Sequence, residues 1–156
     1  MKIIPFLFIP LLFAFANCAS KKNSLIVDPK IPVIEKKANK KLRLEDAQLD
    51  SFPMQSDLIT ILSVSINDNT IEIEVGYSGG CEKHFFSLKG SQFISKSLPP
   101  IRRIKLIHNS NNDQCKKYII QKLEIDITEL AYKKVSGSQI ILKLDGWKNK
   151  IIYTFS

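Results

Sequence analysis

Residues 62–77 read LSVSINDNTIEIEVGY, and this stretch decides the fold class. Apolar and polar residues alternate from Leu62 to Ile66 and again from Ile71 to Tyr77. A period of two places the apolar side chains of a strand on one face. Between the two runs lies Asn67-Asp68-Asn69, whose residue types favour tight turns. The stretch therefore predicts a β-hairpin with one buried face.

The same alternation recurs along the rest of the chain. Further runs lie near residues 84–88, 104–108, 119–127, 140–144 and 151–155, with glycine-rich or asparagine-rich turns between them. No stretch has a convincing helical period, although Leu42 to Leu49 could form a short helix. Seven or so short strands over about 100 residues predict an all-β fold. We expect an antiparallel β-sandwich, immunoglobulin-like or related, with a barrel as the second choice.

The N-terminal segment has the pattern of an export signal. Lys2 precedes an apolar run from Ile3 to Ala16, and Cys18 follows almost at once. The run is shorter than the roughly 20 apolar residues of a spanning helix. Phe15-Ala16-Asn17-Cys18 resembles a relaxed bacterial lipobox, in which Cys18 becomes the diacylated first residue. We therefore expect a lipoprotein signal peptide over residues 1–17, with an ordinary signal peptide and an incidental cysteine as the alternative.

The charge is unevenly distributed. The chain has a formal net charge of +8, and residues 19–44 hold eight basic side chains against two acidic ones. From Glu45 onward, 14 basic residues face 13 acidic ones. We expect residues 18–52 to be the lipidated cysteine and a flexible basic tether that folding does not need, followed by one domain over 53–156. The tether suits an anionic membrane surface, and the domain shows no aromatic-rich basic face for nucleic acid.

Two cysteines and two histidines form two short clusters in the expected domain. Cys81 stands three residues before His84, and His108 stands seven before Cys115. Each histidine shares the apolar face of its strand, so both should point inward near one rim of the sandwich. If their role is structural, each should be hydrogen-bonded to a backbone carbonyl. Exported cysteines normally pair, which favours a disulfide between Cys81 and Cys115. A zinc or copper site made of all four residues is the alternative, and free thiols are the third.

One motif is typical of hydrolases, but the elements expected around it do not fit a hydrolase. Gly76-Tyr77-Ser78-Gly79-Gly80 fits G-x-S-x-G, which needs a strand, a sharp turn and a helix. Here a further strand is expected after the glycines, so Ser78 belongs to a glycine-rich turn and we predict no enzyme. The polar loop from Asn109 to Gln114 has one aspartate, too little charge for a calcium site.

The residues of the expected domain also resemble a known family. Three features carry the resemblance: S-G-G-C-x-x-H-x-F-x-L at 78–88, a later H…D-x-C ending at Cys115, and a closing hairpin over 144–155. In these features the chain is similar to a family of small uncharacterised bacterial lipoproteins. The resemblance covers residues 57–156. It implies export, a lipid anchor and a β-rich domain, with no established activity. It also implies that the two cysteines and two histidines form one cluster in space.

These features together predict a lipid-anchored protein of the bacterial cell envelope. Its disulfide-stapled β-sandwich would act as a binding or structural module for an envelope protein or a small ligand. The alternative is a periplasmic metal-handling lipoprotein that holds zinc or copper. Some lipoproteins are retained at the inner membrane by an aspartate directly after the lipidated cysteine. This chain has Ala19 at that position, which slightly favours the outer membrane.

Overall fold

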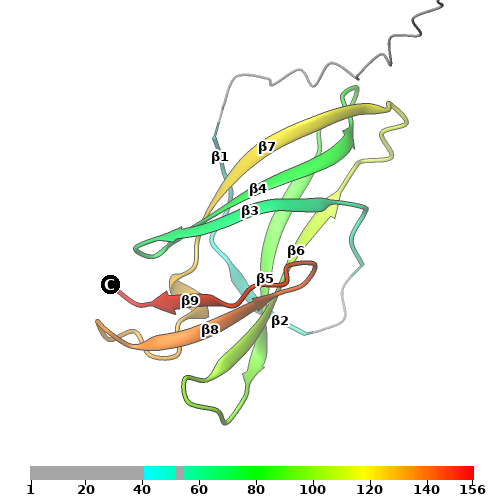
Figure 1. Cartoon of the computed structure of the whole chain (residues 1–156). Coiled ribbons are helices and arrows are strands. Elements are labelled where there is room, and N and C mark those ends of the chain that lie inside the picture. Colours follow the sequence, from blue (N-terminus) through cyan, green and yellow to red (C-terminus); the bar gives the residue numbers. More distant parts are fainter. Residues whose placement is uncertain (1–40, 52–54) are drawn as a thin grey trace, which may run out of the picture. The chain divides into compact units, whose positions relative to one another are not determined.

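The computed structural model describes residues 41–51 and 55–156, which form two β-sheets packed face to face (Figure 1). The first sheet has the order β1-β7-β4-β3 and the second β2-β5-β6-β8-β9. Their strands and one short 3-10 helix are β1 (Leu42–Arg43), β2 (Gln48–Asp50), β3 (Thr60–Asn67), β4 (Thr70–Gly79), β5 (Phe85–Ile94), β6 (Ile101–Asn109), β7 (Lys117–Asp126), η1 (Thr128–Leu130), β8 (Gln139–Leu144) and β9 (Ile151–Thr154). The all-β sandwich is confirmed, and neither sheet closes into a barrel.

The predicted hairpin is the pair β3–β4. Ile66 faces Ile71, and Asn67 faces Thr70, so Asp68 and Asn69 alone make the turn. Asp68 has a φ of 52°, a left-handed conformation that aspartate and asparagine tolerate better than other side chains. The turn residues read from the sequence therefore set the register of the first two long strands.

The core lies between the inner faces of the two sheets. β4 and β7 supply one side, and β6, β8 and β9 supply most of the other. The fully buried large side chains are Ile71, Ile73, Leu88, Ile104, Leu123, Ile125, Ile127, Leu130, Ile140, Leu142, Leu144 and Tyr153. Burying each aliphatic side chain stabilises the fold by about 1.5–3 kcal/mol. The alternation seen in the sequence is thus the alternation between core and solvent.

The sheets are mixed, and the antiparallel expectation is wrong for three strand pairs. β1 pairs with β7, β2 with β5 and β6 with β8 in parallel. After β6 the chain crosses to the first sheet as β7, passes through η1 and returns as β8 in the same direction as β6. Alternation in the sequence specifies which face of a strand is buried but not which strand pairs with it. The parallel pairings therefore could not be predicted from the sequence.

The described part of the expected tether belongs to the fold, which corrects the boundary at residue 52. Residues 42–50 form β1 and β2 instead of a short helix, and each strand extends one sheet. Between them Ala47 is 1% exposed, and its N–H donates to the carbonyl of Asp126 at 2.9 Å. The signal peptide and residues 18–40 lie outside the described residues. Over 41–51 and 55–156 we find no helix with the length and hydropathy needed to cross a membrane.

Candidate functional site

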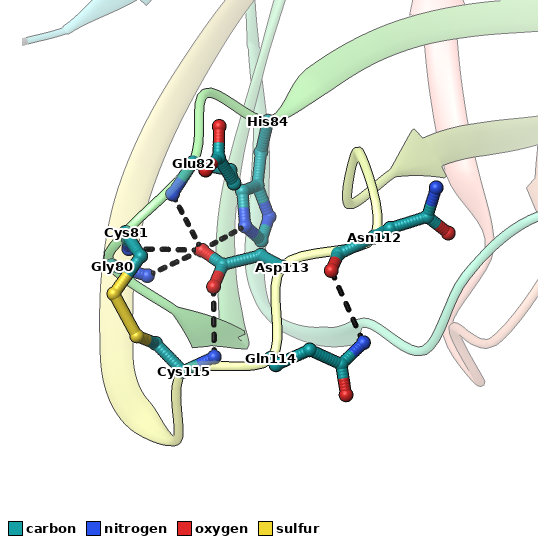
Figure 2. Close-up of a disulfide and its surroundings, with 8 residues drawn as sticks. All are labelled: Gly80, Cys81, Glu82, His84, Asn112, Asp113, Gln114 and Cys115. Atoms are coloured by element: carbon teal, nitrogen blue, oxygen red, sulfur yellow. Dashed lines mark hydrogen bonds and ion pairs between the residues drawn. A yellow bond between two sulfur atoms is a disulfide. The ribbon is translucent and has the colours of Figure 1, made fainter.

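A disulfide joins Cys81 and Cys115 where β4 ends and β7 begins. The antiparallel register of these strands closes with Gly79 opposite Lys117, which brings the segments just beyond them together. The two Cα atoms are 5.9 Å apart and 34 residues apart in sequence (Figure 2). Closing a loop of this length stabilises a fold by about 3–4 kcal/mol in the chain-entropy model. The sequence-based preference for this pairing over a metal site or free thiols agrees with the structure.

Asp113 lies beside the disulfide and organises both segments. Its Oδ2 accepts hydrogen bonds from the main-chain N–H groups of Gly80, Cys81 and Glu82 at 2.8, 3.0 and 2.9 Å. Its Oδ1 accepts one from the N–H of Cys115 at 2.8 Å. These contacts radiate from one carboxylate in Figure 2. The side chain of Asp113 is 0% exposed.

The hydrogen bonds fix the charge of this carboxylate. The main-chain N–H groups, led by that of Glu82, hold the pKa of Asp113 far below its ordinary value. Asp113 is therefore ionised at every physiological pH. The sequence pattern of residues 109–114 predicted only a polar loop and no role for Asp113. The available signal was its place two residues before Cys115, a spacing at which aspartate bonds a main-chain N–H ahead of it.

Two buried histidines extend the network from Asp113. His84 Nε2 lies 3.1 Å from Asp113 Oδ2, and His84 Nδ1 lies 2.8 Å from His108 Nε2. His108 Nδ1 lies 3.1 Å from the carbonyl oxygen of Leu58. Both rings point inward, with His84 9% and His108 2% exposed. The sequence placed them correctly at one rim, but only His108 meets the expected backbone carbonyl.

The network specifies how many protons the two rings carry. The carbonyl of Leu58 only accepts, so His108 Nδ1 must donate; ionised Asp113 only accepts, so His84 Nε2 must donate. The contact between His84 Nδ1 and His108 Nε2 needs a third proton, because two lone pairs would otherwise face each other at 2.8 Å. These contacts give the pair three protons, a net charge of +1 beside the negative charge of Asp113. Burial lowers the pKa of His108.

Aromatic rings and a glycine enclose the histidines. Phe86 stacks on His108 with ring centroids 4.9 Å apart, and Tyr77 lies 4.7 Å from His84. A Cβ at Gly79 would lie 2.5 Å from His84 Nε2, so only glycine fits there. Burial raises the pKa of Tyr77, whose hydroxyl donates to Gln121 at 2.8 Å. We call Cys81, His84, His108, Asp113 and Cys115 the Cys–Asp–His cluster.

The four residues predicted as alternative metal ligands lie together in the cluster, but their sulfur and ring nitrogen atoms are not free to bind a metal. Its two sulfur atoms and a carboxylate oxygen of Asp113 lie within 4.8 Å of one another. The sulfurs are joined, however, and a metal would need thiolates. Each imidazole uses both ring nitrogens in hydrogen bonds. A zinc or copper site therefore stays a prediction that requires reduction of the disulfide and rotation of the histidines.

Ser78 does not have the surroundings of a hydrolytic nucleophile. It lies within β4, directly opposite Tyr118 of β7. The next described element is the strand β5 rather than a helix, so the sharp turn of a nucleophile elbow is missing in this part of the chain. The motif is the glycine-rich end of β4, so Ser78 lies in a strand rather than in the predicted glycine-rich turn.

A groove of about 430 Å³ adjoins the cluster, and no sequence pattern predicted it. We call it the β6 groove; it is lined by Ser56, Asp57, Leu58, Ile59, Thr60, Ile61, Lys105, Leu106, Asp145 and Gly146. One wall is tied to the cluster, because the carbonyl of Leu58 meets His108 and Ser56 Oγ accepts the main-chain N–H of His108. Three segments distant in sequence meet here, which no local pattern encodes.

Comparisons with known proteins support the fold. No protein-family model and no curated protein matches the sequence. A NigD-like immunity protein from Bacteroides caccae is similar in structure, with a TM-score of 0.51 and 14% identity over 72% of this chain and 58% of that one. A putative toxin-related protein from Parabacteroides distasonis gives a TM-score of 0.42 and 15% identity over 70% and 60%. The chain thus spans about three fifths of the length of these solved structures, and the first likeness shows a shared β-fold.

Proposed function

We propose that this protein is a lipid-anchored binding module of the bacterial cell envelope, and that it binds its partner in the β6 groove. The observation that carries the proposal is the contrast between two neighbouring sites. The Cys–Asp–His cluster is closed, with its polar atoms bonded to one another. The groove beside it is open and is lined by apolar and charged side chains, and its wall at Ser56 and Leu58 is hydrogen-bonded to His108. Concave sites of this kind are the usual places for ligands.

The cluster supports binding rather than catalysis. A general base needs a free lone pair within reach of a substrate proton. Both ring nitrogens of His84 and both ring nitrogens of His108 are engaged in hydrogen bonds. Among the described residues, no buried side-chain nitrogen or oxygen atom is without a hydrogen-bond partner. The cluster therefore acts as a scaffold that fixes the groove wall at Ser56 and Leu58.

Export and anchoring are the second part of the proposal. They rest on the apolar run that ends at Cys18, on the resemblance to bacterial lipoproteins and on a disulfide that suits an oxidising compartment. We place the protein at the outer membrane in preference to the inner one. One structural neighbour is described as an immunity protein, but at 14% identity that likeness supports only the fold.

The second candidate function is metal handling. It is favoured by the short distances between the two sulfur atoms and the Asp113 carboxylate, which would suit zinc or copper once the disulfide were reduced. It predicts free thiols in the exported protein, whereas the binding module keeps the disulfide closed.

Photocrosslinking in the native host tests the binding role. Thr60 lines the groove and Ser65 does not, although both are exposed residues of β3. A photoreactive side chain at position 60 should give an adduct of defined mass that the same group at position 65 does not give. Equal labelling from both positions, or none from position 60, would contradict binding in the groove.

A further inference from the structure

We infer that the β6 groove binds an extended peptide segment of a partner protein, which pairs with the main chain of Leu106 as an added strand. The inference rests on the proposed function and names the chemical class of its partner. Adding a strand to a sheet edge is an established mode of peptide recognition, in which main-chain hydrogen bonds hold the ligand.

The hydrogen bonds of β6 define the position of the added strand. The carbonyl of Ile104 accepts from the N–H of Asp145 at 2.9 Å, and the carbonyl of His108 accepts from the N–H of Asp57 at 2.8 Å. Both bonds lie on the edge of β6 that faces away from β5. Because alternate residues of a strand direct their main-chain groups to the same edge, Leu106 turns its N–H and C=O to this edge as well.

No hydrogen bond from a described residue reaches these two groups of Leu106 on this edge. The ladder between β6 and β8 stops with Ile104 opposite Leu144. Beyond it the chain turns back, since the N–H of Trp147 donates to the carbonyl of Leu144. Leu106 is 3% exposed and lines the groove, so an unpaired donor and an unpaired acceptor lie at its floor. Buried main-chain groups without partners are uncommon, and one residue of an extended peptide would satisfy both.

The size and charge of the groove indicate which kind of peptide it would bind. Ile104 and His108 are four residues apart, about 13 Å along a strand, which leaves room for a segment of about three or four residues. Ile59 and Ile61 give the groove an apolar wall. Its charged groups are the carboxylates of Asp57 and Asp145 and the ammonium of Lys105. Lys105 lies 3.9 Å from Asp145, and Asp57 Oδ2 accepts hydrogen bonds from the N–H and the hydroxyl of Ser110. The negative charge in excess is therefore that of Asp57, and it favours a peptide with apolar and basic side chains.

Amide-resolved NMR with a defined probe tests the inference. The probe is acetyl-Lys-Val-Thr-Val-Lys-amide, and its control is the same peptide N-methylated at its three central residues, which removes their N–H donors. The probe should shift the amide signal of Leu106 and slow its hydrogen exchange by about tenfold or more. The N-methylated peptide should bind at least about tenfold more weakly, a loss of about 1.4 kcal/mol.

Two matched variants locate the binding site. Thr60→Trp should fill the mouth of the groove and abolish the shift at Leu106. Ser65→Trp, on the same strand but outside the groove, should leave it unchanged. Circular dichroism of both variants checks that the sandwich is intact.

Several results would overturn the inference. Slow exchange of the Leu106 amide in the free protein would show that its position is already filled. Equal binding of the N-methylated peptide, shifts confined to the outer edges of β3 or β9, or no binding by about 1 mM probe would exclude strand addition at Leu106. A shift that appears without peptide as the protein concentration rises would assign the groove to a second copy of the chain. If the peptide fails while position 60 still crosslinks, the binding role stands and only the strand pairing is wrong.

Discussion

Asp113 is the residue on which the local structure around the disulfide depends. Four main-chain N–H groups and one imidazole converge on its two oxygen atoms. An amide at this position would accept with one atom only and would direct its own donors at the remaining N–H groups. The negative charge also offsets the positive charge of the histidine pair. Asp113 therefore joins two segments that are 31–33 residues apart in sequence.

We expect Asp113→Asn to lower the melting temperature by several degrees at neutral pH. Because folding lowers the pKa of Asp113, its stabilising effect is present above the ordinary pKa of 3.8 and declines as the pH falls below it. The difference between wild type and variant should therefore shrink between about pH 4 and pH 2. Thermal melts across this range check the expectation. Gln114→Asn, an exposed change in the same loop, is the control; an equal effect from it would show that the loop rather than the carboxylate matters.

The two histidines give a second expectation at the residue scale. Three of their four ring nitrogens should carry a proton in the folded protein, and the unprotonated one should be either His84 Nδ1 or His108 Nε2, which contact each other. Nitrogen-15 chemical shifts of the imidazoles distinguish the protonated from the unprotonated state at each nitrogen. Two protons on the pair at neutral pH would contradict the assignment, since the 2.8 Å contact between the rings would then join two acceptors.

At the scale of elements, the seven strands from β3 to β9 were predictable and the two shortest strands were not. Alternation over about five or more residues marked the strands from β3 to β9, because one face of each meets the core. β1 and β2 have two and three residues, too few to show a period. The role of Asp113 was hidden for a different reason, because its partners are main-chain groups that carry no sequence signal. The positions of both histidines were predictable, since each follows the apolar face of its strand.

The docking of residues 42–50 gives a test at this scale. Ala47→Asp would bury a carboxylate without a partner, and we expect it to lower the free energy of unfolding by about 2–4 kcal/mol. Ser51→Asp places the same group at an exposed position of the same segment and should cost little. Urea denaturation measures both variants. Equal stability of Ala47→Asp and the wild type would mean that the segment is a tether after all.

At the scale of the whole molecule, the proposed function joins a lipid anchor to a binding domain. If Cys18 carries the lipid, Cys18→Ser should move the protein from the detergent phase to the aqueous phase when it is expressed in its host. The physical reason is that each buried CH₂ of an acyl chain contributes about 0.8 kcal/mol to membrane binding. Ala19→Ser, next to the cysteine, is the control and should stay in the detergent phase. Unchanged partitioning of Cys18→Ser would contradict lipid anchoring.

The claim central to this function is that the Cys–Asp–His cluster is a closed scaffold beside a binding groove rather than a metal centre. Intact mass spectrometry of protein purified from the host envelope, with and without alkylation, tests it most directly when combined with elemental analysis. We predict a mass two hydrogens below that of the reduced chain, no alkylation of Cys81 or Cys115, and no stoichiometric metal. Two alkylatable thiols together with one zinc or copper ion per chain, lost on His84→Ala, would contradict the claim and make metal handling the function.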